Sequence, residues 1–75
     1  MLKLKDLRED RDLKQSDVAN LLGMSQTNYS KCELEKINIP LDTLRKLAII
    51  FDTSVDYILG LTDISKPYPR KKFDR

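Results

Sequence analysis

Apolar residues recur along most of this chain at spacings of three and four, the period of an α-helix, while strand-like alternation is nearly absent. The pattern predicts five short helices, which cover residues 2–11, 15–22, 25 to 33 or 35, 41–51 and 55–59. Gly23 and Gly60 stand where helix C-caps are expected, and Pro40 precedes the fourth helix. Ser25 and Ser54 are suited to N-caps. The predicted fold class is all-α, with tight turns between the helices.

The composition changes after the last predicted helix. Residues 66–70, Lys-Pro-Tyr-Pro-Arg, cannot form a helix because of their two prolines, so an extended arm is predicted there. We divide the chain into a domain, residues 1–63, and a basic proline-containing C-terminal arm, residues 64–75. The domain has nine Lys/Arg against eleven Asp/Glu and a net charge of −2, whereas the arm has five against one and a net charge of +4. This asymmetry hints at a polyanionic partner. The arm is a solubilising tail, a minor-groove or phosphate-binding arm, or a dimer-stabilising arm, and the sequence leaves all three open.

Length and composition exclude several classes of function. A chain of 75 residues forms one small domain and has no room for a cofactor cavity or a ligand-sensing domain. The absence of histidine and the single cysteine exclude Cys/His zinc sites and Ser-His or Cys-His catalytic dyads. One thiol forms no internal disulfide, which favours a reducing compartment. The longest apolar run, residues 47–51, is far shorter than the roughly 20 residues of a membrane span, and the charged start contains no signal-peptide core. We expect a cytoplasmic protein that is not an enzyme and that binds no metal, cofactor, small molecule or membrane.

Residues 15–31 have the pattern of a helix-turn-helix. Ala19 is small where a second helix crosses closely, and Gly23, four positions later, tolerates the positive φ of the turn. Apolar anchors flank the turn on both sides, and they are Val18, Leu22, Met24 and Tyr29.

A helical wheel divides the third predicted helix into two faces. Tyr29 and Cys32 point inward. The polar outer face consists of Thr27, Ser30 and Lys31, with Gln26 at the exposed N-terminal tip. A helix that presents such side chains is suited to reading base edges in the major groove, and the alternative is an ordinary solvated face. Cys32 is interpreted as a small core residue, with a thiol sensor as the alternative.

Three blocks of sequence, residues 15–31, 39–44 and 53–60, resemble the Xre or phage-repressor/Cro-type helix-turn-helix family. They occur in the family's order and spacing, and the resemblance covers residues 2–63. It implies a compact five-helix lambda-repressor-like DNA-binding domain in which helices 2 and 3 form the helix-turn-helix. It further implies that helix 3 enters the major groove of double-stranded DNA.

The resemblance also implies roles for individual residues. Gln26, Thr27 and Lys31 would contact base edges, and Asn28 and Ser30 would contact bases or phosphates. The residues expected to contact phosphates are Gln15, Lys36, Asn38 and Thr43. Gln15 would also brace Gln26. An ion pair between Arg8 and Glu33 would tie helix 1 to helix 3. Dimer contacts near helix 5 would involve Tyr57 and Leu61, for which a core position is the alternative.

The sequence departs from the family pattern at three positions. Lys14 stands where a serine or threonine usually caps helix 2, so the cap comes from elsewhere or is lost. Glu35 replaces the glycine that usually ends helix 3, so we expect a longer helix or a different loop path. Cys32 replaces a bulkier apolar residue.

The carboxylates of the first predicted helix and the turn after it are interpreted as a solvated face rather than a metal site. They interleave with basic residues at helical spacing, which predicts salt bridges between them. The acidic residues are Asp6, Glu9, Asp10 and Asp12, and the basic ones are Lys5, Arg8 and Arg11.

The function favoured by these observations is sequence-specific DNA binding by a transcriptional regulator, most simply a repressor. One domain reads few base pairs, so we expect a homodimer on a dyad-symmetric operator with half-sites about 34 Å apart. The alternative is a protein-interaction module of the same fold, antitoxin-like or an anti-regulator. The polar outer face of the third helix favours DNA, because a protein-docking face is expected to expose apolar anchors.

Overall fold

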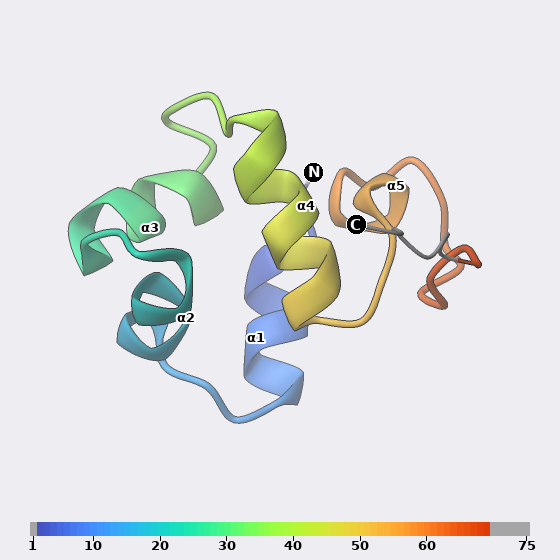
Figure 1. The fold of residues 1–75 in the computed structure, drawn as a ribbon, viewed down its shortest axis with the longest axis horizontal. Coiled ribbons are helices and arrows are strands. Elements are labelled where there is room, and N and C mark those ends of the chain that lie inside the picture. Colours follow the sequence, from blue (N-terminus) through green and yellow to red (C-terminus); the bar gives the residue numbers. More distant parts are fainter. Residues whose placement is uncertain (1, 70–75) are drawn as a thin grey trace, which may run out of the picture.

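The computed structural model describes residues 2–69, and this part of the chain contains five helices and no strand (Figure 1). The helices are α1 (Leu4–Asp10), α2 (Gln15–Leu22), α3 (Gln26–Glu33), α4 (Leu41–Ile50) and α5 (Val55–Ile58). The all-α prediction is confirmed, with helix ends within a few residues of those expected. Four of the arm's basic residues, Arg70, Lys71, Lys72 and Arg75, lie outside the described residues.

Helix α4 runs through the middle of the molecule, with α2 and α3 on one side and α5 on the other (Figure 1). Helix α2 packs against both α3 and α4, and α4 also packs against α5. The backbone N–H of Lys3 donates to the Ile58 carbonyl at 2.9 Å, which fastens the chain before α1 to the end of α5.

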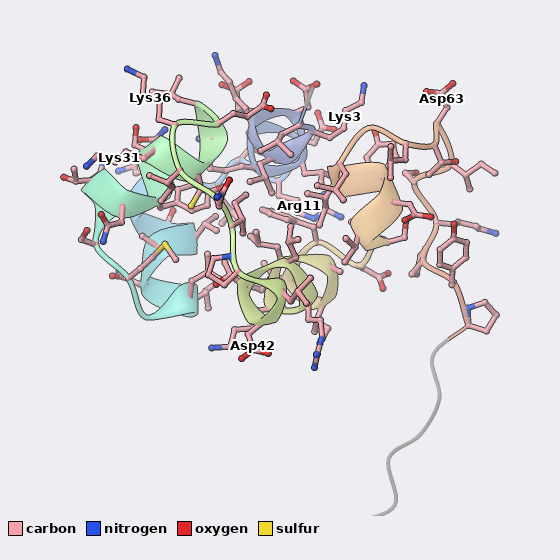
Figure 2. All side chains as sticks on the ribbon, turned by 90° about the horizontal axis from the view of Figure 1, so that it is seen from above. Lys3, Arg11, Lys31, Lys36, Asp42 and Asp63 are labelled. Carbon is pink, nitrogen blue, oxygen red and sulfur yellow. The ribbon has the colours of Figure 1, made fainter. Side chains whose placement is uncertain are left out.

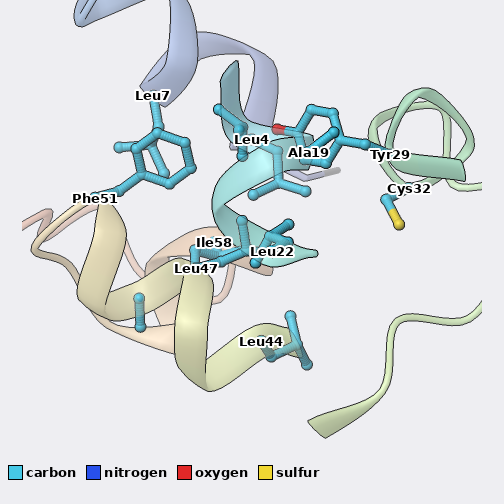
Figure 3. Packing of buried hydrophobic residues seen from close by; sticks show 12 residues of the cluster. Leu4, Leu7, Ala19, Leu22, Tyr29, Cys32, Leu44, Leu47, Phe51 and Ile58 are labelled. Atoms are coloured by element: carbon cyan, nitrogen blue, oxygen red, sulfur yellow. The ribbon is translucent and has the colours of Figure 1, made fainter. Parts of the chain in front are cut away.

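All five helices contribute to one apolar core (Figure 3). Its buried residues are Leu4, Leu7, Val18, Ala19, Leu22, Tyr29, Cys32, Leu44, Leu47, Ala48, Phe51 and Ile58. Tyr29 and Cys32 are the buried residues of α3, as the helical wheel predicted. Since α3 attaches to the apolar core through only these two side chains, the face opposite them is turned to solvent.

Each of the five described helices is followed by a residue in the left-handed region. Two of these residues are glycines, Gly23 (φ 70°) and Gly60 (φ 78°), and three are not: Asp12 (φ 54°), Glu35 (φ 58°) and Asp52 (φ 49°). After α3, the Glu35 N–H donates to the Cys32 carbonyl at 3.1 Å and the Lys36 N–H to the Lys31 carbonyl at 2.9 Å. This pair of bonds is the Schellman motif, which satisfies carbonyls at the helix end.

The expectation for Glu35 was therefore wrong. Helix α3 ends at Glu33 without extension, and Glu35 itself adopts the left-handed conformation that a glycine usually supplies. The two Schellman bonds oppose the cost of that conformation, about 1–2 kcal/mol for a residue with a Cβ. The Glu35 carboxylate also accepts the Leu2 N–H at 3.4 Å, which links this turn to the N-terminal segment.

The helix N-termini agree better with expectation. Ser25 Oγ accepts the Asn28 N–H at 3.2 Å, and Ser54 Oγ accepts the Tyr57 N–H at 3.0 Å, so both serines are N-caps. Helix α2 has no cap from the Lys14 side chain. Its N-terminus is instead bonded through Asp17, whose Oδ2 accepts the Lys14 backbone N–H at 2.8 Å.

The predicted ion pair between Arg8 and Glu33 is present and mostly buried. Arg8 Nε lies 2.7 Å from Glu33 Oε2 and Nη2 lies 3.2 Å from Oε1, with side chains only 11% and 4% exposed. Arg8 Nη1 also donates to the Leu13 carbonyl at 2.9 Å. Burial by itself raises the pKa of Glu33, but the hydrogen bonds from Arg8 and Gln15 and the charge of Arg8 outweigh it and lower that pKa below its ordinary value.

Arg11 has a structural role that the sequence interpretation missed. Its Nη2 donates to the Phe51 carbonyl at 2.6 Å, and its guanidinium lies 5.4 Å from the centroid of the Phe51 ring. The arginine thus binds a carbonyl at the C-terminal end of α4, where a positive charge is favourable.

The first-helix carboxylates are exposed to solvent as predicted, but the salt bridges predicted for them are wrong. Within residues 2–69, the ion pairs are Arg8–Glu33 and Arg45–Asp42, so the four carboxylates from Asp6 to Asp12 form none. The physical reason is that Arg8 and Arg11 turn toward better acceptors, a buried carboxylate and a helix-terminal carbonyl.

Replacing Glu35 by glycine is expected to raise the free energy of unfolding by about 1 kcal/mol, because glycine adopts the left-handed conformation without steric cost. Urea denaturation measures the change. The matched control is Lys36→Gly at the next position, where φ is not positive and glycine brings only added chain entropy in the unfolded state. A Glu35→Gly variant less stable than the native chain would contradict this account of the turn.

Removing one partner of the buried ion pair, as in Glu33→Ala, is expected to lower the free energy of unfolding by about 3–5 kcal/mol, because Arg8 stays buried without its acceptor. The pKa of Glu33 is lower in the folded state than in the unfolded chain. Its stabilising contribution is therefore complete above the unfolded pKa, about 4.3, and is lost as pH falls through the folded pKa.

Unfolding curves measured between pH 7 and pH 3 test whether the stabilising contribution of Glu33 is lost on acidification. The native chain should lose more stability on acidification than Glu33→Gln, whereas Glu9→Gln, which removes an exposed carboxylate without an ion pair, should follow the native chain. Equal losses in the native and Glu33→Gln proteins would refute the assignment.

Candidate nucleic-acid interface

Helices α2 and α3 form a helix-turn-helix around Gly23. The φ of 70° at Gly23 turns the chain, and the Met24 N–H donates to the Ala19 carbonyl at 3.0 Å. Ala19 is 1% exposed, which agrees with its predicted place at the close approach between helices. With Tyr29 and Cys32 in the core, the turn presents the opposite face of α3 to solvent.

An open groove runs along that face. The residues that line it are Gln15, Gln26, Thr27, Ser30, Lys31, Leu34 and Lys36. All three predicted base readers are among them, together with one of the two residues expected to assist and two of the four expected phosphate contacts. Gln26, Thr27, Lys31 and Lys36 are exposed, and Gln15 and Ser30 are half-buried.

Three of the predicted contact residues lie outside this groove. Asn28 is exposed in the first turn of α3, where its backbone N–H is bonded to the N-cap Ser25. Asn38 lies in the loop after α3 and lines a separate pocket with Leu2 and Leu44. Thr43 is half-buried in the first turn of α4. The structure therefore brings together the central part of the predicted site and leaves these three at its periphery.

Gln15 is held differently from what we expected. Its Nε2 donates to Glu33 Oε1 at 3.2 Å, and the described part of the chain contains no hydrogen bond between Gln15 and Gln26. The expected brace is thus replaced by a bond to the ion pair, because the Glu33 carboxylate is a stronger acceptor than an amide oxygen. One amide N–H is engaged, so the second N–H and Oε1 are left to bind a ligand.

The groove is locally basic although the domain is acidic. Two lysines and no carboxylate line it. Figure 2 shows Lys31 and Lys36 along the same edge of the molecule as Lys3, with Asp42 on the opposite edge. The nearest buried acid on α3, Glu33, is neutralised by Arg8. The lining of the groove is therefore positive despite the net charge of the domain, although the exposed Glu35 directly precedes Lys36 in the chain.

Cys32 lies beneath the groove rather than in it. The side chain is buried, and burial raises the pKa of its thiol. A thiol with a raised pKa is a poor nucleophile at neutral pH, which favours the core interpretation over the thiol sensor.

Leu34 is the groove residue that the sequence interpretation missed. The outer face of the third helix was expected to expose no apolar anchor, but Leu34 is 62% exposed and lines the groove. The signal was available, because Leu34 follows Thr27 by seven residues and so shares its helix face.

The predicted dimer residues and the arm lie at the other end of the molecule. Tyr57 is half-buried against the core, and Leu61 is 73% exposed. The described part of the arm, residues 64–69, is extended and folds back beside α5, away from α3 (Figure 1). Thr53 Oγ1 donates to the Ser65 carbonyl at 2.6 Å, and the Tyr68 hydroxyl donates to Asp56 Oδ2 at 2.8 Å.

No helix between residues 2 and 69 has the length and apolar character needed to cross a membrane. In the same part of the chain, no three of the Cys, Asp and Glu side chains are grouped as metal ligands would be.

Curated relatives match most of the chain. An uncharacterized HTH-type transcriptional regulator of Bacillus subtilis strain 168, YobD, is 40% identical over 70 residues, which are 93% of this chain and 62% of that protein. The HTH-type transcriptional regulator ImmR of the same strain is 33% identical over 85% of this chain and 50% of its own length. The immF control region 10 kDa protein of Bacillus phage phi105 is 34% identical over 81% of this chain and 67% of its own length.

The matched segment spans only half to two-thirds of these relatives. The family model described as helix-turn-helix matches residues 4–58, which include all of α1 to α5. The chain belongs to the Xre/Cro-type helix-turn-helix family.

Proposed function

We propose that this chain is a sequence-specific DNA-binding transcriptional regulator that reads the major groove with α3. The observation that carries the proposal is the groove itself, where Gln26, Thr27 and Lys31 lie together on the solvent face of α3. Amide and hydroxyl groups donate to and accept from base edges, and a lysine binds guanine or phosphate. The names of YobD and ImmR, both HTH-type transcriptional regulators, support the same role.

Around these base readers, Gln15 and Lys36 are proposed to bind phosphates at the two sides of α3. Gln15 lies at the N-terminus of α2, where a helix dipole favours an anion, and Glu33 holds its amide in place. Asn28, Ser30, Asn38 and Thr43 are proposed as peripheral contacts to base or backbone. Phosphate contacts fix the orientation of α3 and base contacts give the specificity.

Regulation is proposed to act by repression in the cytoplasm, with a homodimer that occupies a promoter and excludes polymerase. Two copies bound to half-sites about 34 Å apart would read twice the sequence of one. Such a role needs neither catalysis nor a small-molecule ligand, because the concentration of the protein sets the occupancy of the operator.

Selection of bound duplexes from a random pool tests the proposal. The expected result is one enriched dyad-symmetric site, with affinity that falls as salt rises because bound phosphates release counterions. Gln26→Ala should relax the base preference at one position per half-site by about 1–3 kcal/mol. Lys36→Ala should weaken all duplexes about equally and lower the salt slope by about one.

The control for both variants is Lys46→Ala, which removes an exposed lysine of α4 that does not line the groove. It should leave site preference unchanged. Absence of any enriched site, together with affinity independent of salt, would favour the protein-interaction module and end the DNA proposal.

The dimer has its own prediction. If Leu61 lies between the two copies, Leu61→Asp should place a charge in an apolar contact and lower affinity for the full dyad site at least tenfold. Affinity for a single half-site should not change. Sedimentation of the native and variant proteins with each duplex measures both quantities, and an unchanged two-to-one complex would remove Leu61 from the interface.

A further inference from the structure

The apolar residue in the groove has no structural task that explains its position. Leu34 is the C-cap residue of α3 and does not belong to the core cluster or to the partly buried residues packed against it. A Schellman motif often adds an apolar contact between the residues that its longer bond joins. Here these are Lys31 and Lys36, so the motif does not use the leucine either.

The helix geometry places Leu34 in line with the predicted base readers. It follows Thr27 by seven residues, nearly two turns, so both side chains lie on one face about 10 Å apart along the axis. Base pairs are stacked about 3.4 Å apart. A separation of this size allows Leu34 and Thr27 to reach different base pairs, while Lys31 and Lys36 line the same groove beside Leu34.

We propose that Leu34 determines specificity by apolar contact with the C5-methyl group of a thymine. This inference rests on the proposed DNA-binding function and deepens it. In the major groove the thymine methyl is the apolar group that base edges present, and the leucine side chain has no group that could hydrogen-bond to any base. An exposed leucine among polar base readers thus has one chemically matching target on the DNA.

The test replaces each thymine of the selected duplex in turn by deoxyuridine, which removes only the methyl group. For the native chain, one position in each half-site should lose about fourfold in affinity, as expected for one buried methyl. Leu34→Ala should weaken binding to the thymine duplex by a similar or larger factor. At that position alone, it should bind the thymine and uracil duplexes equally.

Three further variants sharpen the assignment. Leu34→Met keeps an apolar side chain of similar volume and should retain the sensitivity to the methyl group. Leu21→Ala is the matched control, since Leu21 is also 62% exposed but does not line the groove, and it should behave as the native chain does. Thr27→Ser removes the other methyl group near the bases and should alter sensitivity at a different position. Thermal unfolding of each variant verifies that the fold is intact.

The outcomes separate this inference from the function beneath it. A selected site at which the native chain and Leu34→Ala lose the same affinity on methyl removal would overturn the thymine contact and leave DNA binding in place. Failure of the native chain to select any site would overturn both.

Discussion

One carboxylate, that of Glu33, connects α1, α2 and α3. It accepts two hydrogen bonds from Arg8 of α1 and one from Gln15 of α2, while its own backbone closes the last turn of α3. Helix α3 has only two buried apolar side chains, so apolar packing alone fixes its direction weakly. The ion pair supplies the missing constraint, because a bidentate arginine–carboxylate contact accepts little rotation. The presentation of Gln26, Thr27 and Lys31 depends on it.

The helix ends set the remaining geometry. Isolated helices shorter than about 12–15 residues are marginal in water, and every described helix here is shorter than that. Each is stabilised by the shared core and by a left-handed residue that closes its last turn. After α3 the left-handed residue is Glu35, whose backbone is strained because it has a Cβ. Its conformation ends α3 abruptly at Glu33. Lys36 then lies beside Lys31 in the groove instead of being carried away on a longer helix.

The helices and the helix-turn-helix turn could be predicted from patterns among residues that are close in sequence. Periodicity placed the helices, and the spacing of Ala19 to Gly23 identified the turn, because both depend on residues close in sequence. The family resemblance added the Arg8–Glu33 pair. The contacts that sequence reasoning missed or misplaced join distant segments: Arg11 binds a carbonyl 40 residues away, and Gln15 binds Glu33 rather than Gln26. The packing of the helices determines which acceptor an arginine or amide side chain binds. The spacing of residues in the sequence does not predict that acceptor.

The charge of the groove differs in sign from the net charge of the domain. The domain is acidic overall, yet Lys31 and Lys36 line its groove. The buried carboxylate of α3, that of Glu33, is paired with Arg8. The basic arm begins beside α5, at the far end from α3, and Thr53 and Asp56 hold it there. The described part of the arm, residues 64–69, thus lies away from α3. In the proposed complex the choice of sequence is therefore left to the groove.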